Sequence, residues 1–355
     1  MQMRRFALIA VTCLLAGTAR GEQIAGWLSK LSVHGYLSQA YAISDDHPIF
    51  GIPTRGTADY RDVALQFRYD ANRKNSAVVQ LRHARFGDRP RQPDDVELDW
   101  AFYQHNFSDR FAVKAGRIPL PLGIFNETGG PAGGSPFFRP PSEFYERRYS
   151  SKTVEGALAS LALGDAAGWS FDVDGYAGRW TVDSGLTQRA DARDAWGAQV
   201  WMNTPWSGVR IGAGAYRCEV DPPTRLPVDY LMMHASAEAD LDRWRLASEL
   251  IRGNLGTSGR YRAWYAQAGY QVTPRLSVHA RAAVARMHGR SNGQRFDADL
   301  SEDLGLALNF AVHPHVLLKL EGHTNDGLRI EDQQVEHQTP PSQTRYMIAS
   351  ITATY

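Results

Sequence analysis

Residues 304–320 read LGLALNFAVHPHVLLKL, and the spacing of their apolar side chains indicates the fold class. Every second position of its first half carries a large apolar side chain: Leu304, Leu306, Leu308, Phe310 and Val312. The alternation resumes after the short break His313-Pro314-His315. A period of two is typical of a β-strand whose two faces meet different surroundings, and a short break with proline is typical of a turn. The stretch therefore predicts an antiparallel β-hairpin.

The same alternation occurs along most of the chain, which predicts an all-β fold. In 96–103, for example, Leu98, Trp100 and Phe102 are expected on one face and Glu97 and Asp99 on the other. Counting every run gives about sixteen candidate strands, a number within the even series of bacterial outer-membrane barrels. They begin near Val33, Val63, Ala77, Val96, Phe111, Val154, Trp169, Trp196, Val209, Tyr230, Trp244, Ala263, Leu276, Leu304, Val316 and Tyr346.

The connections between these candidate strands alternate in length. Tight turns are expected at 71–75, 107–110, 164–168, 203–208, 240–243, 273–275 and 313–315. Longer stretches rich in Gly, Pro and charge lie between them, at 45–60, 87–95, 118–150, 178–194, 219–228, 253–260, 288–301 and 324–344. This alternation predicts a transmembrane antiparallel up-and-down β-barrel, with both chain ends on the side of the tight turns.

The start of the chain indicates export. Residues 1–5 are basic, 6–17 are apolar but too short to span a bilayer, and small residues precede position 22. We therefore expect 1–21 to be a cleaved signal peptide, 22–30 a short periplasmic segment and 31–355 the barrel. With the signal removed, Cys218 is the one cysteine left, so no internal disulfide is expected. A formal net charge of +1 argues against nucleic acid as a partner.

Alternation alone does not separate a membrane barrel from a soluble exported β-protein. The tryptophans favour the membrane, because Trp100, Trp169, Trp196, Trp244 and Trp264 lie near strand ends, where interfacial aromatic rings are expected. A third reading is a barrel enzyme that hydrolyses lipid, which would need an outward Ser-His pair. We find no catalytic Gly-x-Ser-x-Gly, His-Glu-x-x-His or Gly-Lys-Ser/Thr motif, and we expect no enzyme activity, no cofactor and no metal.

The longest connection, 118–150, is the candidate functional segment. It follows Gly116-Arg117, and its density of Pro and Gly excludes helix and inner strand, while its many Phe and Tyr residues argue against disorder. The motif GRIPLPLGIFNE at 116–127 resembles the segment that opens the third loop of sixteen-stranded porins of the phosphate-selective-porin and DcaP-like type. The terminal strand 346–355, which ends on Tyr355, is similar to those of outer-membrane barrels. In place of the Arg-Asp type pair usual there, Gly129-Gly130 follow the motif.

The resemblance implies a porin for passive diffusion of small hydrophilic solutes or ions, with loop 118–150 folded inward as the constriction. It implies a homotrimer in the outer membrane of a Gram-negative bacterium, in contact with lipid, lipopolysaccharide and the barrel-assembly machinery, with both termini periplasmic. Charged side chains at a narrow point set selectivity, so an excess of Arg on the loop predicts a mild preference for anions.

The candidate site residues follow from the loop and from strand parity. The constriction is expected to carry Arg117, Glu127, Arg139, Glu143, Arg147 and Arg148. The pore wall is expected to carry Arg68, Arg82, Lys114, Glu97, Asp99, Asp172, Arg281 and Lys319, with Glu155 and Glu249 among further acidic wall positions. Pairing of these charges across strands is the alternative role for any one of them.

Overall fold

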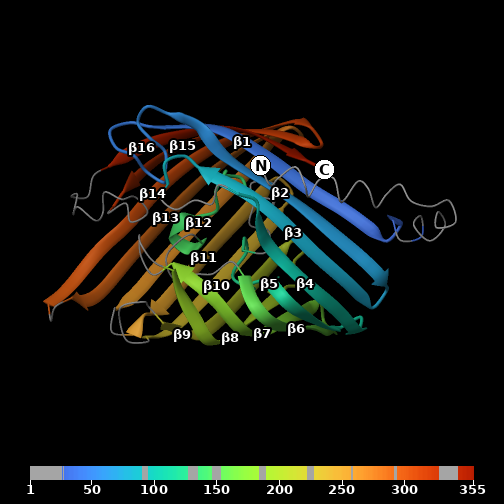
Figure 1. Cartoon of the computed structure of the whole chain (residues 1–355). Coiled ribbons are helices and arrows are strands. Elements are labelled where there is room, and N and C mark those ends of the chain that lie inside the picture. The colour runs from blue at the N-terminus through green and yellow to red at the C-terminus, as the bar shows by residue number, and fades with distance from the viewer. Residues whose placement is uncertain are drawn as a thin grey trace, which may run out of the picture.

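The structure is a computed structural model that describes residues 26, 28–89, 95–126, 135–145, 153–183, 189–221, 228–256, 259–291, 294–327 and 343–355. The predicted signal peptide, 1–21, lies outside the described residues, as does most of 22–30. The described part of the chain forms sixteen strands that follow one another around a closed barrel in sequence order (Figure 1).

The first eight strands are β1 (Leu31–Ser44), β2 (Thr57–Asn72), β3 (Asn75–Phe86), β4 (Glu97–Ser108), β5 (Phe111–Pro119), β6 (Thr153–Ala166), β7 (Trp169–Asp183) and β8 (Arg189–Asn203). The second eight are β9 (Val209–Asp221), β10 (Val228–Leu241), β11 (Trp244–Asn254), β12 (Arg260–Thr273), β13 (Leu276–Ser291), β14 (Gln294–His313), β15 (Val316–Asp326) and β16 (Thr344–Thr354). One short helix, α3 (Ser142–Tyr145), lies in the connection between β5 and β6. The expectation that 118–150 contains no helix was wrong for these four residues, which follow Pro140-Pro141, the last prolines of that segment.

Antiparallel pairing of β1 with both β2 and β16 closes the barrel. Closure leaves no sheet edge, so the backbone N–H and C=O groups of the strands bond within the sheet. The Gly35 amide donates to the Tyr355 carbonyl at 3.0 Å, which seals the seam at the end where the chain starts and finishes. The prediction of an antiparallel up-and-down barrel of about sixteen strands is confirmed. No helix in the described ranges is long and apolar enough to cross a membrane.

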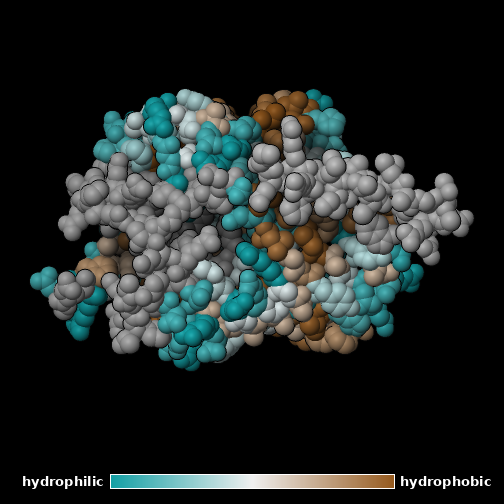
Figure 2. Space-filling view, in the orientation of Figure 1, coloured by the Kyte–Doolittle hydropathy of each residue, from teal (hydrophilic) through white to brown (hydrophobic). Residues whose placement is uncertain are grey.

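The two faces of the sheet differ as the alternation predicts. On β14 the outward side chains are large, apolar and exposed, with Leu306 exposed to 68%. The inward side chains between and beside them, such as Asp303, Asn309 and Lys319, are polar and buried. Brown hydrophobic surface is also visible in the middle of Figure 2, near β3. A wall that is apolar outside and polar inside is the arrangement of a barrel in a bilayer.

A β-bulge on β4 corrects the predicted faces of that strand. Leu98 pairs with Leu81 on the outside, but the register shifts next to it, and Phe102 pairs with Val78 on the inside. Trp100 and Phe102 therefore have inward parity, whereas the prediction placed them outward. A bulge adds one residue to one strand and reverses every later side chain, so a strict period of two fails beyond it.

Two predicted long loops are mostly strand. β7 continues to Asp183 and β8 starts at Arg189, so little of 178–194 is loop. β13 continues to Ser291 and β14 starts at Gln294, so little of 288–301 is loop, and this hairpin projects beyond its neighbours (Figure 1). The outward positions of these extensions are charged or small, so the hydrophobic alternation that marks a half-buried strand is missing.

The hydrophobic cores lie inside the barrel, between its wall and the connections that enter it. One cluster joins Leu120, Leu122, Phe125, Phe144 and Tyr145 of the β5–β6 connection to inward aromatic side chains of the wall. A second joins Phe138 of the same connection to residues of β1, β2, β16 and the β1–β2 connection. Packing of this kind gives the β5–β6 connection a fixed place within the barrel.

The outward face of β14 supplies a direct test of lipid contact. We expect Leu306→Arg to lower the free energy of unfolding by about 2–4 kcal/mol in lipid vesicles, because it places a charge in hydrocarbon. The measurement is urea unfolding followed by tryptophan fluorescence.

Val96→Arg is the matched control, because Val96 is also exposed but lies just before β4 begins. Its expected cost is below about 1 kcal/mol, as for a residue near the membrane interface. Equal costs for the two variants would contradict lipid contact at Leu306.

Candidate functional site

The candidate site is the part of the β5–β6 connection that enters the barrel, residues 120–126 and 135–145, which we call the inner loop. Its leucines and aromatic side chains are buried, and Ile124 is half-buried. Its polar contacts reach inward-facing residues of β8, β11 and β12–β15. A segment between β5 and β6 that contacts these strands extends across the interior. The predicted inward fold of the third loop is confirmed for its described residues.

Glu249 on β11 is the first anchor of the inner loop. Its side chain is 2% exposed and lies on the inward face, opposite Tyr265 of β12. The carboxylate accepts hydrogen bonds from the Tyr265 hydroxyl at 2.6 Å, the Ser236 hydroxyl at 2.5 Å and the backbone amide of Ile124 at 2.9 Å. The Tyr145 hydroxyl donates to it as well. A buried carboxylate needs several donors, and here two of them come from the loop.

Gly123 permits this close approach of loop to wall. Its φ is +63°, a left-handed conformation, and a Cβ at this position would overlap the Glu249 carboxylate and the Tyr145 hydroxyl. Its amide donates to Gln199 Oε1 on β8 at 2.7 Å. Burial raises the pKa of the Tyr145 phenol, and the Glu249 carboxylate beside it raises that pKa further. The phenol therefore keeps its proton and remains a donor to Glu249.

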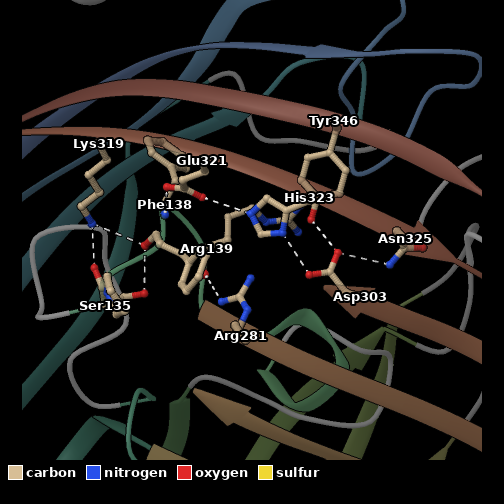
Figure 3. Close-up of polar contacts among 12 residues, drawn as sticks. Ser135, Phe138, Arg139, Arg281, Asp303, Lys319, Glu321, His323, Asn325 and Tyr346 are labelled. Atoms are coloured by element: carbon tan, nitrogen blue, oxygen red, sulfur yellow. Dashed lines mark hydrogen bonds and ion pairs between the residues drawn. The ribbon is translucent and has the colours of Figure 1, made fainter. Parts of the chain in front are cut away.

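A second anchor lies on β13–β15 (Figure 3). The Phe138 amide donates to Glu321 Oε1 at 2.5 Å, and the Lys319 ammonium donates to the Ser135 carbonyl at 2.7 Å. Arg281 donates to the Arg139 carbonyl at 3.0 Å and stacks on the Phe137 ring with its Cζ 4.1 Å from the centroid. The wall charges Lys319, Glu321 and Arg281 thus satisfy backbone groups of the loop that are buried away from water.

A polar network supports this anchor from behind. His323 Nδ1 lies 3.0 Å from Asp303 Oδ1, and the His323 ring stacks on Tyr346 at 4.5 Å between centroids. The Tyr346 hydroxyl donates to Asp303 Oδ2 at 2.9 Å, and the Asn325 amide donates to the same oxygen at 3.4 Å (Figure 3). Each of these side chains comes from a strand, so the network fixes the inward side chains on which the loop rests.

Two of the predicted constriction residues in the described part of the chain, Arg139 and Glu143, hold the loop in place. Arg139 is 7% exposed, with its guanidinium 4.8 Å from the Phe50 ring centroid and 5.3 Å from that of Phe86. Glu143 accepts from the Ser301 hydroxyl at 2.7 Å. Buried groups of this kind hold the loop in place and do not meet solutes directly.

Arg117 has outward parity, which corrects its predicted place in the constriction. It pairs with Ala101 and with Glu155, and Glu155 pairs with and binds Arg179 on the outer face of β7. Glu155 is therefore outward too, and its predicted inward parity was wrong. Glu127, Arg147 and Arg148 lie outside the described residues.

The predicted wall residues have inward positions, and most are paired. Arg82 makes a bidentate ion pair with Asp62, both bonds 2.8 Å. The remaining wall contacts are Arg68 with Asp70, Glu97 opposite Arg82 in register, Asp99 with Gln80, Lys114 over the Phe102 ring, and Asp172 with Asn203. Near the tight turns Arg210 pairs with Glu238, and Arg245 with Asp240, in more exposed positions. The wall is thus covered by the inner loop at Glu249 and Lys319 and is more open toward the tight turns.

Comparisons with known proteins support the barrel. The sequence matches no family model and no curated protein. Among solved structures it is similar to OmpF of Salmonella typhi in complex with daunomycin, at 12% identity and a TM-score of 0.64, over 92% of this chain and 97% of that one. It is similar to the outer membrane channel DcaP of Acinetobacter baumannii, at 9% and 0.61, over 92% and 97%. It is also similar to the anion-selective porin from Comamonas acidovorans, at 10% and 0.61, over 92% and 99%. The chain thus has the sixteen-stranded fold of outer-membrane porins.

Removal of the Glu249 carboxylate tests the first anchor. We expect Glu249→Ala to speed hydrogen exchange at the amides of 118–126 at least about tenfold, because charge-assisted hydrogen bonds of ~1.5–3 kcal/mol each are lost. Exchange is measured by mass spectrometry on the folded protein.

Glu238→Ala is the control, because Glu238 is an inward carboxylate that pairs with Arg210. We expect it to leave exchange at 118–126 unchanged. Equal protection of this segment in both variants would show that Glu249 does not hold the loop.

Proposed function

We propose that the protein is an outer-membrane porin through which small hydrophilic solutes or ions diffuse passively. The observation that carries the proposal is the inner loop, anchored across the interior of a closed barrel whose outer face is apolar. In this proposal the loop reduces the open cross-section of the barrel, and water and small solutes pass beside it. In this proposal residues 118–150 form the constriction, and the protein has no catalytic role.

The location and assembly belong to the same proposal. Both ends of the barrel sheet lie on the side of the tight turns, which we place in the periplasm of a Gram-negative bacterium, after removal of 1–21 and insertion by the barrel-assembly machinery. We propose a homotrimer in contact with lipid and lipopolysaccharide. Support comes from the trimer form of OmpT, an outer membrane protein of Vibrio cholerae, to which the chain is similar at 10% identity and a TM-score of 0.58, over 92% of this chain and 99% of that one.

The proposed charge selectivity is weak. The expected preference for anions rested on loop arginines, and Arg139 is buried against aromatic rings. On the wall, Arg82 and Arg210 are paired with carboxylates, which cancels much of their field. Lys114 is the wall cation that we expect to act most on passing ions, since it has inward parity on β5, between β4 and β6, and makes no ion pair within the described residues.

A lipid hydrolase would need a Ser-His pair that faces lipid, and one Ser-His contact occurs on β13. Ser277 Oγ and His279 Nε2 are 2.9 Å apart on β13, but both residues have inward parity, facing away from lipid. This geometry favours the diffusion role. A phospholipid hydrolysis assay on the purified protein separates the two functions, since the porin should give no turnover above a detergent blank.

Reversal of the Lys114 charge tests the channel. In planar bilayers we expect the wild-type protein to give stepwise conductance with an anion-to-cation permeability ratio within about threefold of unity. Lys114→Glu should shift that ratio toward cations by about twofold, because the charge acts inside the pore where screening is limited.

Arg179→Glu is the control variant, because it makes the same charge change on the outer face of β7. It should leave the ratio unchanged. The absence of conductance steps from folded protein, or an equal shift in both variants, would contradict the proposed channel.

A further inference from the structure

The outer face of β11–β13 carries arginines side by side at the end of the barrel away from the tight turns. Arg252 pairs in register with Arg262, and Arg262 pairs with Arg286. Arg260 lies two residues from Arg262 on the same face, opposite His288. All four arginines are exposed. We call Arg252, Arg260, Arg262 and Arg286 the arginine patch.

Parity and burial place the arginine patch outward, directly beyond the apolar band. The neighbouring row on the same face consists of Leu250, Trp264 and Val284, which also pair in register, and Leu250 and Trp264 are exposed. The residues between the two rows, Ile251, Ala263 and Ala285, are buried inside the barrel. A tryptophan in the last apolar row is typical of the membrane–water interface, so the patch lies at headgroup level.

The patch lacks a full set of protein counter-charges. Directly opposed like charges destabilise a sheet. The flanking strands carry the acidic residues of this face: on β14 Asp299 pairs with Arg286 at 2.9 Å, Asp297 pairs with His288 at 2.8 Å and Glu302 lies opposite Val284. On β10 Asp229 pairs with Arg217 at 3.2 Å. Within the described ranges, no ion pair involves Arg252, Arg260 or Arg262. Three arginines on two adjacent strands therefore present unneutralised charge beside an apolar band.

We propose that the arginine patch binds the phosphorylated headgroup of a membrane lipid in the leaflet on the side of the long connections. Guanidinium groups bind phosphate through paired hydrogen bonds, and closely spaced arginines suit a headgroup with more than one phosphate. The apolar row beneath would contact the acyl chains of the same lipid. A second copy docked on the same face through a two-fold axis would set arginine against arginine, so the charge favours lipid over a symmetric dimer through this face.

The experiment compares lipid binding by a double variant and a matched control in detergent micelles. Native mass spectrometry would measure the affinity of the full chain for bis-phosphorylated lipid A, for its dephosphorylated form and for inorganic phosphate. We expect Arg252→Gln with Arg262→Gln to weaken binding of the phosphorylated lipid at least about tenfold, since two charge-assisted contacts are lost. The dephosphorylated lipid should bind both proteins weakly and equally.

The control is Arg193→Gln with Arg217→Gln, two exposed arginines on β8 and β9 that already pair with Asp221 and Asp229. It should bind the phosphorylated lipid like the wild type. Unchanged affinity in the first double variant, or an equal loss in the control, would overturn the proposal. Inorganic phosphate that bound as tightly as the lipid would identify a free-anion site, and a changed oligomeric state with unchanged lipid binding would identify an interface between copies.

The inference rests on the proposed insertion in a membrane, but its failure is distinguishable from failure of the channel. The patch is outside the lumen, so its double variant should retain wild-type conductance in planar bilayers. A protein that bound the lipid without forming a channel would retain the lipid site and lose the porin function. A channel with wild-type conductance and no phosphate-dependent lipid binding would retain the porin function and overturn the lipid site.

Discussion

The structure depends on one constraint: backbone polar groups placed in hydrocarbon must all be hydrogen-bonded within the protein. An open sheet would leave two unpaired edges, so β1 must pair with β16 as well as with β2. Closure then separates the outside of the barrel from its interior. The strands carry apolar side chains on the outer face and polar side chains on the inner face. Leu306 and Asn309, three residues apart on β14, illustrate the division, since one is exposed on the outer face and the other is buried inside.

The same constraint operates a second time inside the barrel. The inner loop has few backbone bonds of its own, so carboxylates and cations of the wall must satisfy its buried amides and carbonyls. Glu249, Glu321 and Lys319 do so directly. The wall charges beneath the loop therefore serve as its supports, and those nearer the tight turns remain exposed to the lumen. One set of inward charges thus has two roles, decided by whether the loop covers them.

Much of the fold could be predicted from the sequence, because the alternation of apolar and polar residues is a local pattern that occurs again in strand after strand. The prediction failed at two kinds of place. The bulge on β4 put Phe102 on the inner face instead of the outer face. Where β13 extends beyond the apolar band, its outward residues near Arg286 are polar, so the extension was predicted to be a loop. Glu249 was recognisable as an inward acid, but its donors Tyr145 and Ile124 lie more than 100 residues away in the chain. Arg139 was placed on the correct loop, yet the rings around it, Phe50 and Phe86, come from two other segments of the chain, which no local pattern reveals.

In this structure one face of each strand contacts lipid while the other encloses water. Spin labels placed singly at positions 171–174 of β7, on a cysteine-free background in lipid vesicles, distinguish the two faces. Phe171 and Val173 face outward and Asp172 and Asp174 inward. We expect collision with oxygen to dominate at 171 and 173, and collision with a water-soluble nickel complex to dominate at 172 and 174. Equal access of the nickel complex to all four positions would contradict this expectation.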